Sequence, residues 1–205
     1  MTRSDWNQYE NAASNHELST EQTHEGSSSL KTNDASKYSQ EILAVSEDDS
    51  PEESQIVTEV YPDGETAFYT IHRYQDTANY YMLGFYYGGR DAAVGLRKVV
   101  GGKESVVQEY SLSGGNVGGQ KLSDGSYARD RFAPYRATLW VDSGGDLRGR
   151  IEEDADRDGY WTQLGDDMVD TTPDFTDGGG VGLGSYNAHT YEGNVCYWDE
   201  TKVYY

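Results

Sequence analysis

Apolar and polar residues alternate along most of this chain. A period of two is the pattern of β-strands that place one face on a core. Turn-forming pairs such as Asp63-Gly64, Gly101-Gly102 and Gly144-Gly145 interrupt the alternation at short intervals. Only the short stretch 36–45 departs from it. Many short strands joined by glycine-rich turns predict an all-β sandwich or barrel.

Nine strands can be placed from this pattern. They are expected at Gln55 to Tyr61, Thr66 to Tyr74, Asn79 to Tyr87, Ala92 to Val100, Glu104 to Tyr110, Tyr135 to Asp142, Asp146 to Glu152, Gly180 to Tyr186 and Asn194 to Tyr205. The strand 79–87 has large apolar side chains on both faces, which predicts a central position in its sheet. The acidic segment 46–54 is expected to be a loop. No linker divides the chain, so residues 1–205 are expected to form a single domain.

The charge balance adds a second constraint. The chain has 36 Asp and Glu residues against 16 Lys and Arg, a formal net charge of -20. The acids are spread over the whole chain, so they repel one another at low ionic strength. Salt screens this repulsion, with a Debye length of about 3 Å at 1 M. Such an acid-rich, lysine-poor balance resembles the proteins of halophilic archaea. With no basic stripe to neutralise phosphates, nucleic-acid binding is excluded.

Neither a leader peptide nor a membrane span is expected. The first ten residues are polar, and no apolar run is long enough to cross a bilayer. The single cysteine, Cys196, cannot form an internal disulfide and lies in a strand-like segment, so a small buried thiol is expected there.

Four stretches resemble the concanavalin A-like lectin/glucanase (laminin-G-like) superfamily, close to its carbohydrate-binding modules. They are Trp6 with Gly26–Lys31, Arg73–Tyr81 with Gly95–Val99, Asp177–Leu183, and Val195–Val203. Each pattern is weak alone, but together they span nearly the whole chain in the family's order. The resemblance implies a two-sheet antiparallel jelly-roll sandwich. Fold does not fix function, which depends on the residues of the binding or catalytic site.

One candidate metal site follows from spacing. Asp154, Asp156 and Asp158 stand at alternate positions before Gly159, and Ca²⁺ prefers several oxygens on a tight turn. An EF-hand would also need a glutamate where Gly165 stands. The alternative is an acidic hairpin tip in an acidic protein.

A second candidate metal site involves Asp199. On the last strand Tyr197, Asp199, Thr201 and Val203 share one face, which is expected to be the buried one. A buried carboxylate needs a partner. The family resemblance implies a structural calcium held by Asp199 with the loop at Glu25 and Gly26. The alternative is a hydrogen bond to backbone N–H groups.

Aromatic and polar residues could form a sugar-binding face, because aromatic rings with polar tips stack on the C–H faces of sugars. The candidates are Arg73, Tyr86, Arg97, Trp161, Tyr186 and Asn187. The structural alternative is that tyrosine is common in strands whatever they bind. Arg73, expected on a central strand, must be paired or face a groove.

The chain lacks the paired carboxylates of glycoside hydrolysis in the family's Glu-x-Asp-x-x-Glu spacing, and it lacks a Gly-x-Ser-x-Gly motif. A non-catalytic, lectin-like protein is therefore expected. Charge, fold and N-terminus together favour a virion surface component of a halophilic archaeal virus: a capsid decoration, turret, tail fibre or spike. Its expected partners are copies of itself, other virion proteins and cell-envelope glycans. The alternatives are a lectin that is free in the cytoplasm or exported to the extracellular space, and a secreted or cell-surface glycan-degrading enzyme of the glucanase type.

Overall fold

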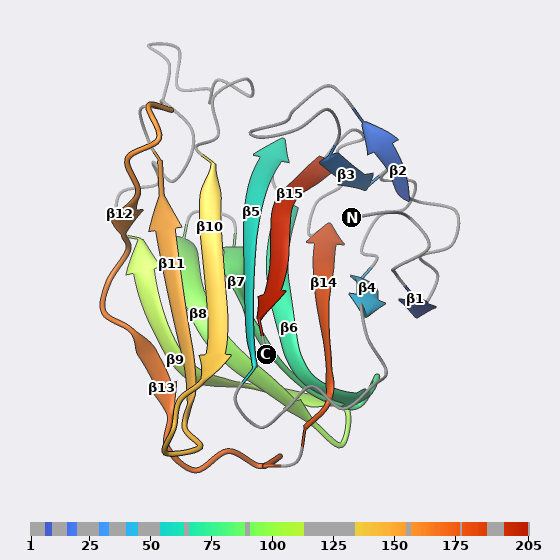
Figure 1. Ribbon diagram of the computed structural model, residues 1–205, viewed down its shortest axis with the longest axis vertical. Helices are drawn as coiled ribbons and strands as arrows, with labels where there is room; N and C mark the ends of the chain where they lie inside the picture. Colours follow the sequence, from blue (N-terminus) through green and yellow to red (C-terminus); the bar gives the residue numbers. More distant parts are fainter. Residues whose placement is uncertain are drawn as a thin grey trace.

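Two antiparallel sheets pack face to face in this protein (Figure 1). The computed structural model describes residues 54–63, 66–88, 91–112, 134–154, 157–176, 178–187 and 195–204, together with the backbone of four short strands at 7–9, 16–19, 29–32 and 40–44. The described residues contain strands, turns and bends but no helix, and so no helix long and apolar enough to span a membrane. The fold is an all-β, two-sheet jelly-roll sandwich, as predicted.

The seven-stranded sheet has the order β1-β4-β14-β6-β7-β8-β9. Its strands are β1 (Asn7–Tyr9), β4 (Gln40–Ala44), β14 (Gly180–Asn187), β6 (Thr66–Asp76), β7 (Asn79–Gly88), β8 (Asp91–Val100) and β9 (Lys103–Leu112). Strands β6 to β9 form a continuous meander. The predicted central strand β7 lies between β6 and β8.

The eight-stranded sheet has the order β12-β11-β10-β5-β15-β3-β2, with β13 pairing separately with β11. Its strands are β12 (Thr162–Gln163), β11 (Leu147–Glu153), β10 (Tyr135–Val141), β5 (Gln55–Asp63), β15 (Val195–Tyr204), β3 (Ser29–Thr32), β2 (His16–Ser19) and β13 (Met168–Asp170). The C-terminal strand β15 lies between β5 and β3, so the chain's end is built into the sheet.

The nine strands expected from the sequence are all present, with differences of one or two residues at their ends. Stretch 36–45, where the alternation fails, contains the strand β4. Six short strands, β1 to β4, β12 and β13, were not among the nine, because two to five residues carry too little alternation to detect. Of the expected loop 46–54, only Ser54 lies inside the described residues.

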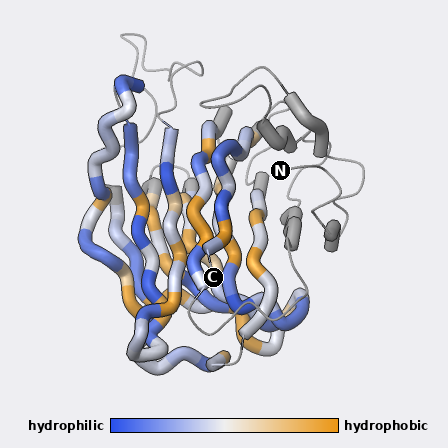
Figure 2. Tube along the Cα trace, in the orientation of Figure 1, coloured by the Kyte–Doolittle hydropathy of each residue, from blue (hydrophilic) through white to orange (hydrophobic). Residues whose placement is uncertain are grey.

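The core lies between the two sheets, and every second residue of the inner strands faces it. Strand β10 alternates buried and half-buried positions without a break, and Cys196 is buried as expected. Rings from both sheets meet there: Tyr135 of β10 lies 5.5 Å from Phe68 and 5.4 Å from Phe85, measured between ring centroids. Figure 2 shows apolar positions recurring along the strands and hydrophilic positions in the turns at the lower edge.

Candidate functional site

The outer face of the seven-stranded sheet carries a second apolar cluster, separate from the core. Its members are Tyr69, Ile71, Tyr74, Tyr80, Met82 and Val99, with Tyr86 packed against them. On β7, Tyr81 and Leu83 face the core while Tyr80 and Met82 face outward. Both faces of β7 are therefore covered, as its sequence predicted.

Glycines form a row across this outer face. Gly184 of β14 is in register with Tyr69, Tyr69 with Gly84 of β7, and Gly84 with Gly95 of β8. A Cβ atom added at Gly84 would overlap the carbonyl oxygen of Phe68, so β6 and β7 approach too closely there for any other residue. The Tyr69 ring in this row is 2 % exposed, and its hydroxyl donates to the carbonyl of Ser185 at 3.3 Å.

Arg97 and Tyr86 are brought together on this same outer face. The guanidinium carbon of Arg97 lies 3.6 Å from the centroid of the Tyr86 ring. Arg97 donates to Glu104 at 2.6 Å and also pairs with Glu109, both on β9. Its side chain is 19 % exposed, against 47 % for Glu104, so the carboxylate is the more accessible group. A cation stacked on a ring and held between two carboxylates forms a fixed polar cluster.

Burial and pairing act in opposite directions at this cluster. Burial alone would lower the pKa of Arg97, but its hydrogen bonds to Glu104 and Glu109 outweigh that effect and raise the pKa. Burial raises the pKa of the Tyr86 hydroxyl. The arginine stays charged and the tyrosine neutral across the ordinary pH range. The cluster offers fixed donors and acceptors beside a ring, the combination that recognises sugar hydroxyls.

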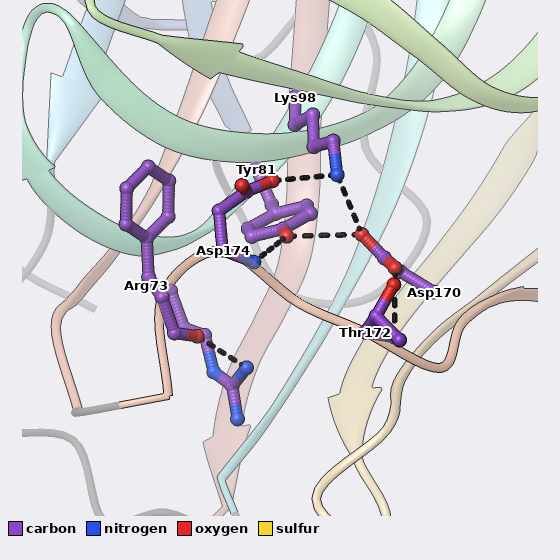
Figure 3. A network of polar contacts seen from close by, with 7 residues as sticks. Arg73, Tyr81, Lys98, Asp170, Thr172 and Asp174 are labelled. Carbon is purple, nitrogen blue, oxygen red and sulfur yellow. Dashed lines mark hydrogen bonds and ion pairs between the residues drawn. The ribbon is translucent and has the colours of Figure 1, made fainter.

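Arg73 lies elsewhere and has a structural partner. It is buried at 2 % exposure, has a positive φ of 50°, and donates through Nη1 to the carbonyl of Phe175 at 2.5 Å (Figure 3). Phe175 in turn packs edge-on against the Tyr81 ring. Arg73 is therefore paired, as its position on a central strand required, and it anchors the segment that follows β13.

A polar network, buried at Tyr81 and Asp170 and partly exposed at Lys98 and Asp174, fixes the same segment (Figure 3). The Tyr81 hydroxyl donates to Asp170 Oδ2 at 3.0 Å and accepts the Asp174 N–H at 2.8 Å. Lys98 pairs with both carboxylates, at 3.2 Å and 2.6 Å. The hydrogen bond to Asp174 raises the pKa of Lys98, and burial raises that of Tyr81. Each member of the network has a partner, so the network stabilises the connection from β13 to β14.

On the outer face of the eight-stranded sheet, Trp161 is also stacked under an arginine. The guanidinium carbon of Arg136 lies 4.1 Å from the Trp161 ring centroid. Arg136 also donates to Glu59 Oε1 from both Nη2, at 2.6 Å, and Nε, at 3.2 Å. The Glu59 side chain is only 4 % exposed. Trp161 is thus on the opposite sheet from Tyr86 and Arg97, and the predicted single sugar-binding face is divided.

Asp199 is buried as expected, but not on the face that was expected. Cys196 and Trp198 belong to the core, which places Asp199 on the outer face, in register with Glu59. A bulge between Asp199 and Lys202, with Glu200 at a φ of 45°, shifts the alternation and returns Val203 toward the core. Asp199 Oδ1 accepts the backbone N–H of Glu200 at 2.9 Å.

Asp154 is buried and closes a tight turn. Its carboxylate accepts the N–H of Asp158 at 3.1 Å and that of Gly159 at 2.9 Å. Of the other predicted metal ligands, Asp156, Glu25 and Gly26 lie outside the described residues. Within the part of the chain that is described, no three acidic, histidine or cysteine side chains gather as a metal site.

The two predicted acidic sites nonetheless act on one side chain. Burial raises the pKa of Tyr61, and the negative charges of Glu59, Asp199 and Asp154 raise it further. Two acidic sites that the sequence suggested separately therefore lie around the same tyrosine, on the outer face of the eight-stranded sheet.

Several residues of these clusters were missed from the sequence. They are Glu59, Tyr61, Glu104, Glu109 and Arg136. The two-residue turn at Gly101-Gly102 could have placed Glu104 opposite Val99, next to Arg97. No feature of the sequence indicates the bulge beside Arg97, which brings Glu109 close to that arginine. Tyr186 and Asn187 lie opposite Ala67 and Thr66, and their side chains are outside the described set.

Solved structures with the same fold include carbohydrate-binding proteins. The carbohydrate-binding module CBM66 from Bacillus subtilis has a TM-score of 0.58 at 16% identity and covers 98% of this chain and 96% of that one. The exoplasmic/lumenal domain of VIP36, in its Ca²⁺/Man3GlcNAc-bound form, has a TM-score of 0.55 at 8% identity, covering 99% and 84%. A Bacillus subtilis protein of unknown function with a galectin-like fold has a TM-score of 0.57 at 12% identity, covering 98% and 89%.

A GH43 glycoside hydrolase also matches, with a TM-score of 0.57 at 10% identity, but this chain spans only 38% of its length. No family model matches the sequence. No curated protein matches it either. At these identities the likeness shows the fold alone, a β-sandwich shared by carbohydrate-binding proteins and by part of a glycoside hydrolase.

Proposed function

We propose that this protein is a non-catalytic glycan-binding module whose ligand lies on the outer face of the seven-stranded sheet. The observation that carries the proposal is the Arg97 cluster, in which a guanidinium stacked on Tyr86 is held between Glu104 and Glu109. Vicinal sugar hydroxyls are both donors and acceptors, so they match a cation flanked by carboxylates. The ligand would contact the accessible carboxylates of Glu104 and Glu109 on β9, whose side chains are 47 % and 29 % exposed.

Binding to immobilised glycans in multi-molar KCl tests this proposal. Glu109→Gln should weaken retention at least fivefold, because a carboxylate acceptor is replaced by an amide while size is kept. Arg148→Ala is the matched control, since Arg148 pairs with Asp142 and Asp146 on the other sheet. Equal retention of the wild type and Glu109→Gln would contradict the placement of the ligand. No retention of the wild type on neutral or acidic glycans would contradict the function.

Glu104 and Glu109 are also the observation that favours a second function, a glycan-degrading enzyme. Glycoside hydrolases use two carboxyl groups, one of which donates a proton. Here one guanidinium engages both carboxylates, so neither is set apart as a proton donor. We therefore expect no new reducing ends when glycans that bind are incubated with the protein. Release of reducing ends that Glu104→Gln abolishes would favour the enzyme.

Calcium is proposed as a structural ion at the 154–159 turn. Gly159 has a φ of 86°, and the Asp154 carboxylate already gathers two backbone N–H groups, which fits an Asp-x-Asp-x-Asp-Gly loop. Asp154, Asp156 and Asp158 would hold the ion and stiffen the turn. CaCl₂ should raise the unfolding midpoint more than MgCl₂ of equal concentration, and Asp158→Asn should remove the difference. If it persists in Asp158→Asn and disappears in Asp199→Asn, calcium binds with Asp199 instead.

We further propose that the protein is a surface component of a halophilic archaeal virion. It would be present there as a symmetric homo-oligomer beside other virion proteins. The net charge of -20 supports the halophilic part, and repeated sites would multiply weak glycan binding. Mass spectrometry of purified virions and light scattering in multi-molar salt test it. A monomer absent from virions would leave an extracellular glycan-binding protein.

A further inference from the structure

One aromatic side chain is far more accessible than the tyrosines of the seven-stranded sheet. Tyr160, at the tip that leads into β12, is 80 % exposed, and no other large apolar side chain in the described residues is as open. Tyr69 and Tyr80 are each 2 % exposed, so their rings are already covered. The Tyr160 ring is therefore accessible to a ligand, whereas the rings of Tyr69 and Tyr80 are not.

The backbone that leads to Tyr160 is held by hydrogen bonds within the turn 154–160. The Asp154 carboxylate accepts the N–H groups of Asp158 and Gly159, and Asp158 Oδ1 accepts the N–H of Tyr160 itself at 3.0 Å. The N–H of Arg157 donates to the Asp154 carbonyl at 3.3 Å. A ring presented by a fixed turn loses little conformational freedom when it binds, which favours affinity.

The residue after Tyr160 packs against the eight-stranded sheet. Trp161 is half-buried under Arg136, whose guanidinium is tied to Glu59. This stack anchors the chain immediately after Tyr160 to the eight-stranded sheet. The exposed ring thus stands between two fixed points, the Asp154 turn and the Trp161–Arg136 stack.

Charge selects the class of ligand. The tip carries Asp154, Asp156 and Asp158, and the whole chain has a net charge of -20. Salt screens the charge of the whole chain, but a sulfate or uronate bound in contact with the Asp158 carboxylate would still be repelled, because screening is weak within the Debye length of roughly 3 Å at 1 M. A tyrosine ring stacks on apolar C–H faces, and carboxylates accept hydrogen bonds from hydroxyl groups. A neutral pyranose sugar has both features and no charge to be repelled.

We propose that Tyr160 is the stacking platform of a second subsite, which binds a neutral sugar on the eight-stranded sheet, opposite the sheet that carries Arg97. The inference rests on the proposed glycan-binding function and adds the ligand class and a second point of contact. Two contacts on one polysaccharide, or on neighbouring chains, would raise apparent affinity through effective concentration.

Affinity electrophoresis in multi-molar KCl with constant CaCl₂ tests the inference. The probes are neutral glucans, mannans and galactans, each run beside its sulfated derivative. Tyr160→Ala should lose at least fivefold in affinity for the retained neutral glycan, and Tyr160→Trp should keep or strengthen it. Tyr204→Ala is the matched control, because Tyr204 is 51 % exposed on the last strand. Unchanged unfolding midpoints would show that each variant is folded.

The outcomes separate this inference from the proposed function. If Glu109→Gln loses affinity and Tyr160→Ala does not, the proposed function stands and the Tyr160 subsite is wrong. If the sulfated glycans bind as tightly as the neutral ones, the assigned ligand class is wrong. If the wild type retains no glycan, both proposals are overturned.

Discussion

The two outer faces of the sandwich carry clusters of the same residue types that differ in the exposure of the glutamate. Each has an arginine stacked on an aromatic ring and paired with glutamate: Arg97 with Tyr86 on one sheet, Arg136 with Trp161 on the other. In the first cluster the glutamate is the accessible member, with Glu104 at 47 % exposure. In the second it is hidden, with Glu59 at 4 %. The same residue types therefore form a surface that can meet a ligand in one case and a buried ion pair in the other.

The difference lies in the neighbours. Arg97 is on β8, next to the edge of its sheet, and its glutamates are on the edge strand β9. Glu59 is on β5, inside the sheet, directly opposite Asp199. A buried carboxylate next to another one is costly without a cation, so Arg136 is needed for stability. Exposure of the acid thus separates a candidate binding cluster from a structural one.

The largest expected effect is that of Arg136→Ala. It leaves Glu59 buried beside Asp199 without its guanidinium, so we expect a loss of about 3 kcal/mol in the free energy of unfolding. Urea titration in multi-molar KCl measures it. Arg150→Ala is the control on the same sheet: Arg150 pairs with the partly exposed Asp167 and should cost less than about 1 kcal/mol. Equal losses in the two variants would break the contrast between hidden and accessible acids.

Acid should reduce the free energy of unfolding by a comparable amount through His72, which is buried between the sheets. This loss must be distinguished from the effect of acid on the carboxylates of the two outer faces. Burial lowers the pKa of His72 to about 4 from 6.5, and its Nε2 lies 3.1 Å from the Ser54 hydroxyl and carbonyl oxygens. Neutral His72 therefore stabilises the fold fully above pH 6.5, and that stability is lost as the pH falls toward 4. The shift corresponds to about 3 kcal/mol at most.

His72→Gln tests this assignment, because glutamine does not titrate and can keep a hydrogen bond to Ser54. Between pH 6.5 and 4 its free energy of unfolding should fall less steeply than that of the wild type. Parallel curves would show that carboxylates on the outer faces, and not His72, govern the acid response.

The sequence predicted the strands far better than the clusters. Alternation placed β5 to β11, β14 and β15, because each strand is at least seven residues long. The position of Asp199 was misjudged, since a bulge at Glu200 reverses the alternation and nothing local announces it. Arg97 and Tyr86 were both candidates, but their contact depends on the register of β7 and β8. Glu59 and Arg136, 77 positions apart, are joined only by the pairing of β5 with β10.

Arg97→Ala should have a smaller effect on stability and a larger one on binding. Its glutamate partners are partly exposed, so losing the ion pairs and the ring contact should cost about 1 kcal/mol. Retention on neutral glycans should nevertheless fall at least fivefold. A stability loss equal to that of Arg136→Ala would show that both clusters are structural, and the proposed binding face would lose its support.

The smallest expected effect is the coupling between the two faces. Arg97 and Arg136 lie on opposite sheets with the shared core between them, and they pair with different residues: Arg97 with Glu104 and Glu109, Arg136 with Glu59. In the double variant their stability losses should add to within about 0.5 kcal/mol. Urea titration of the two single variants and the double variant measures the coupling. A larger coupling would mean that the core transmits strain between the sheets, and the two faces would then have to be treated as one unit.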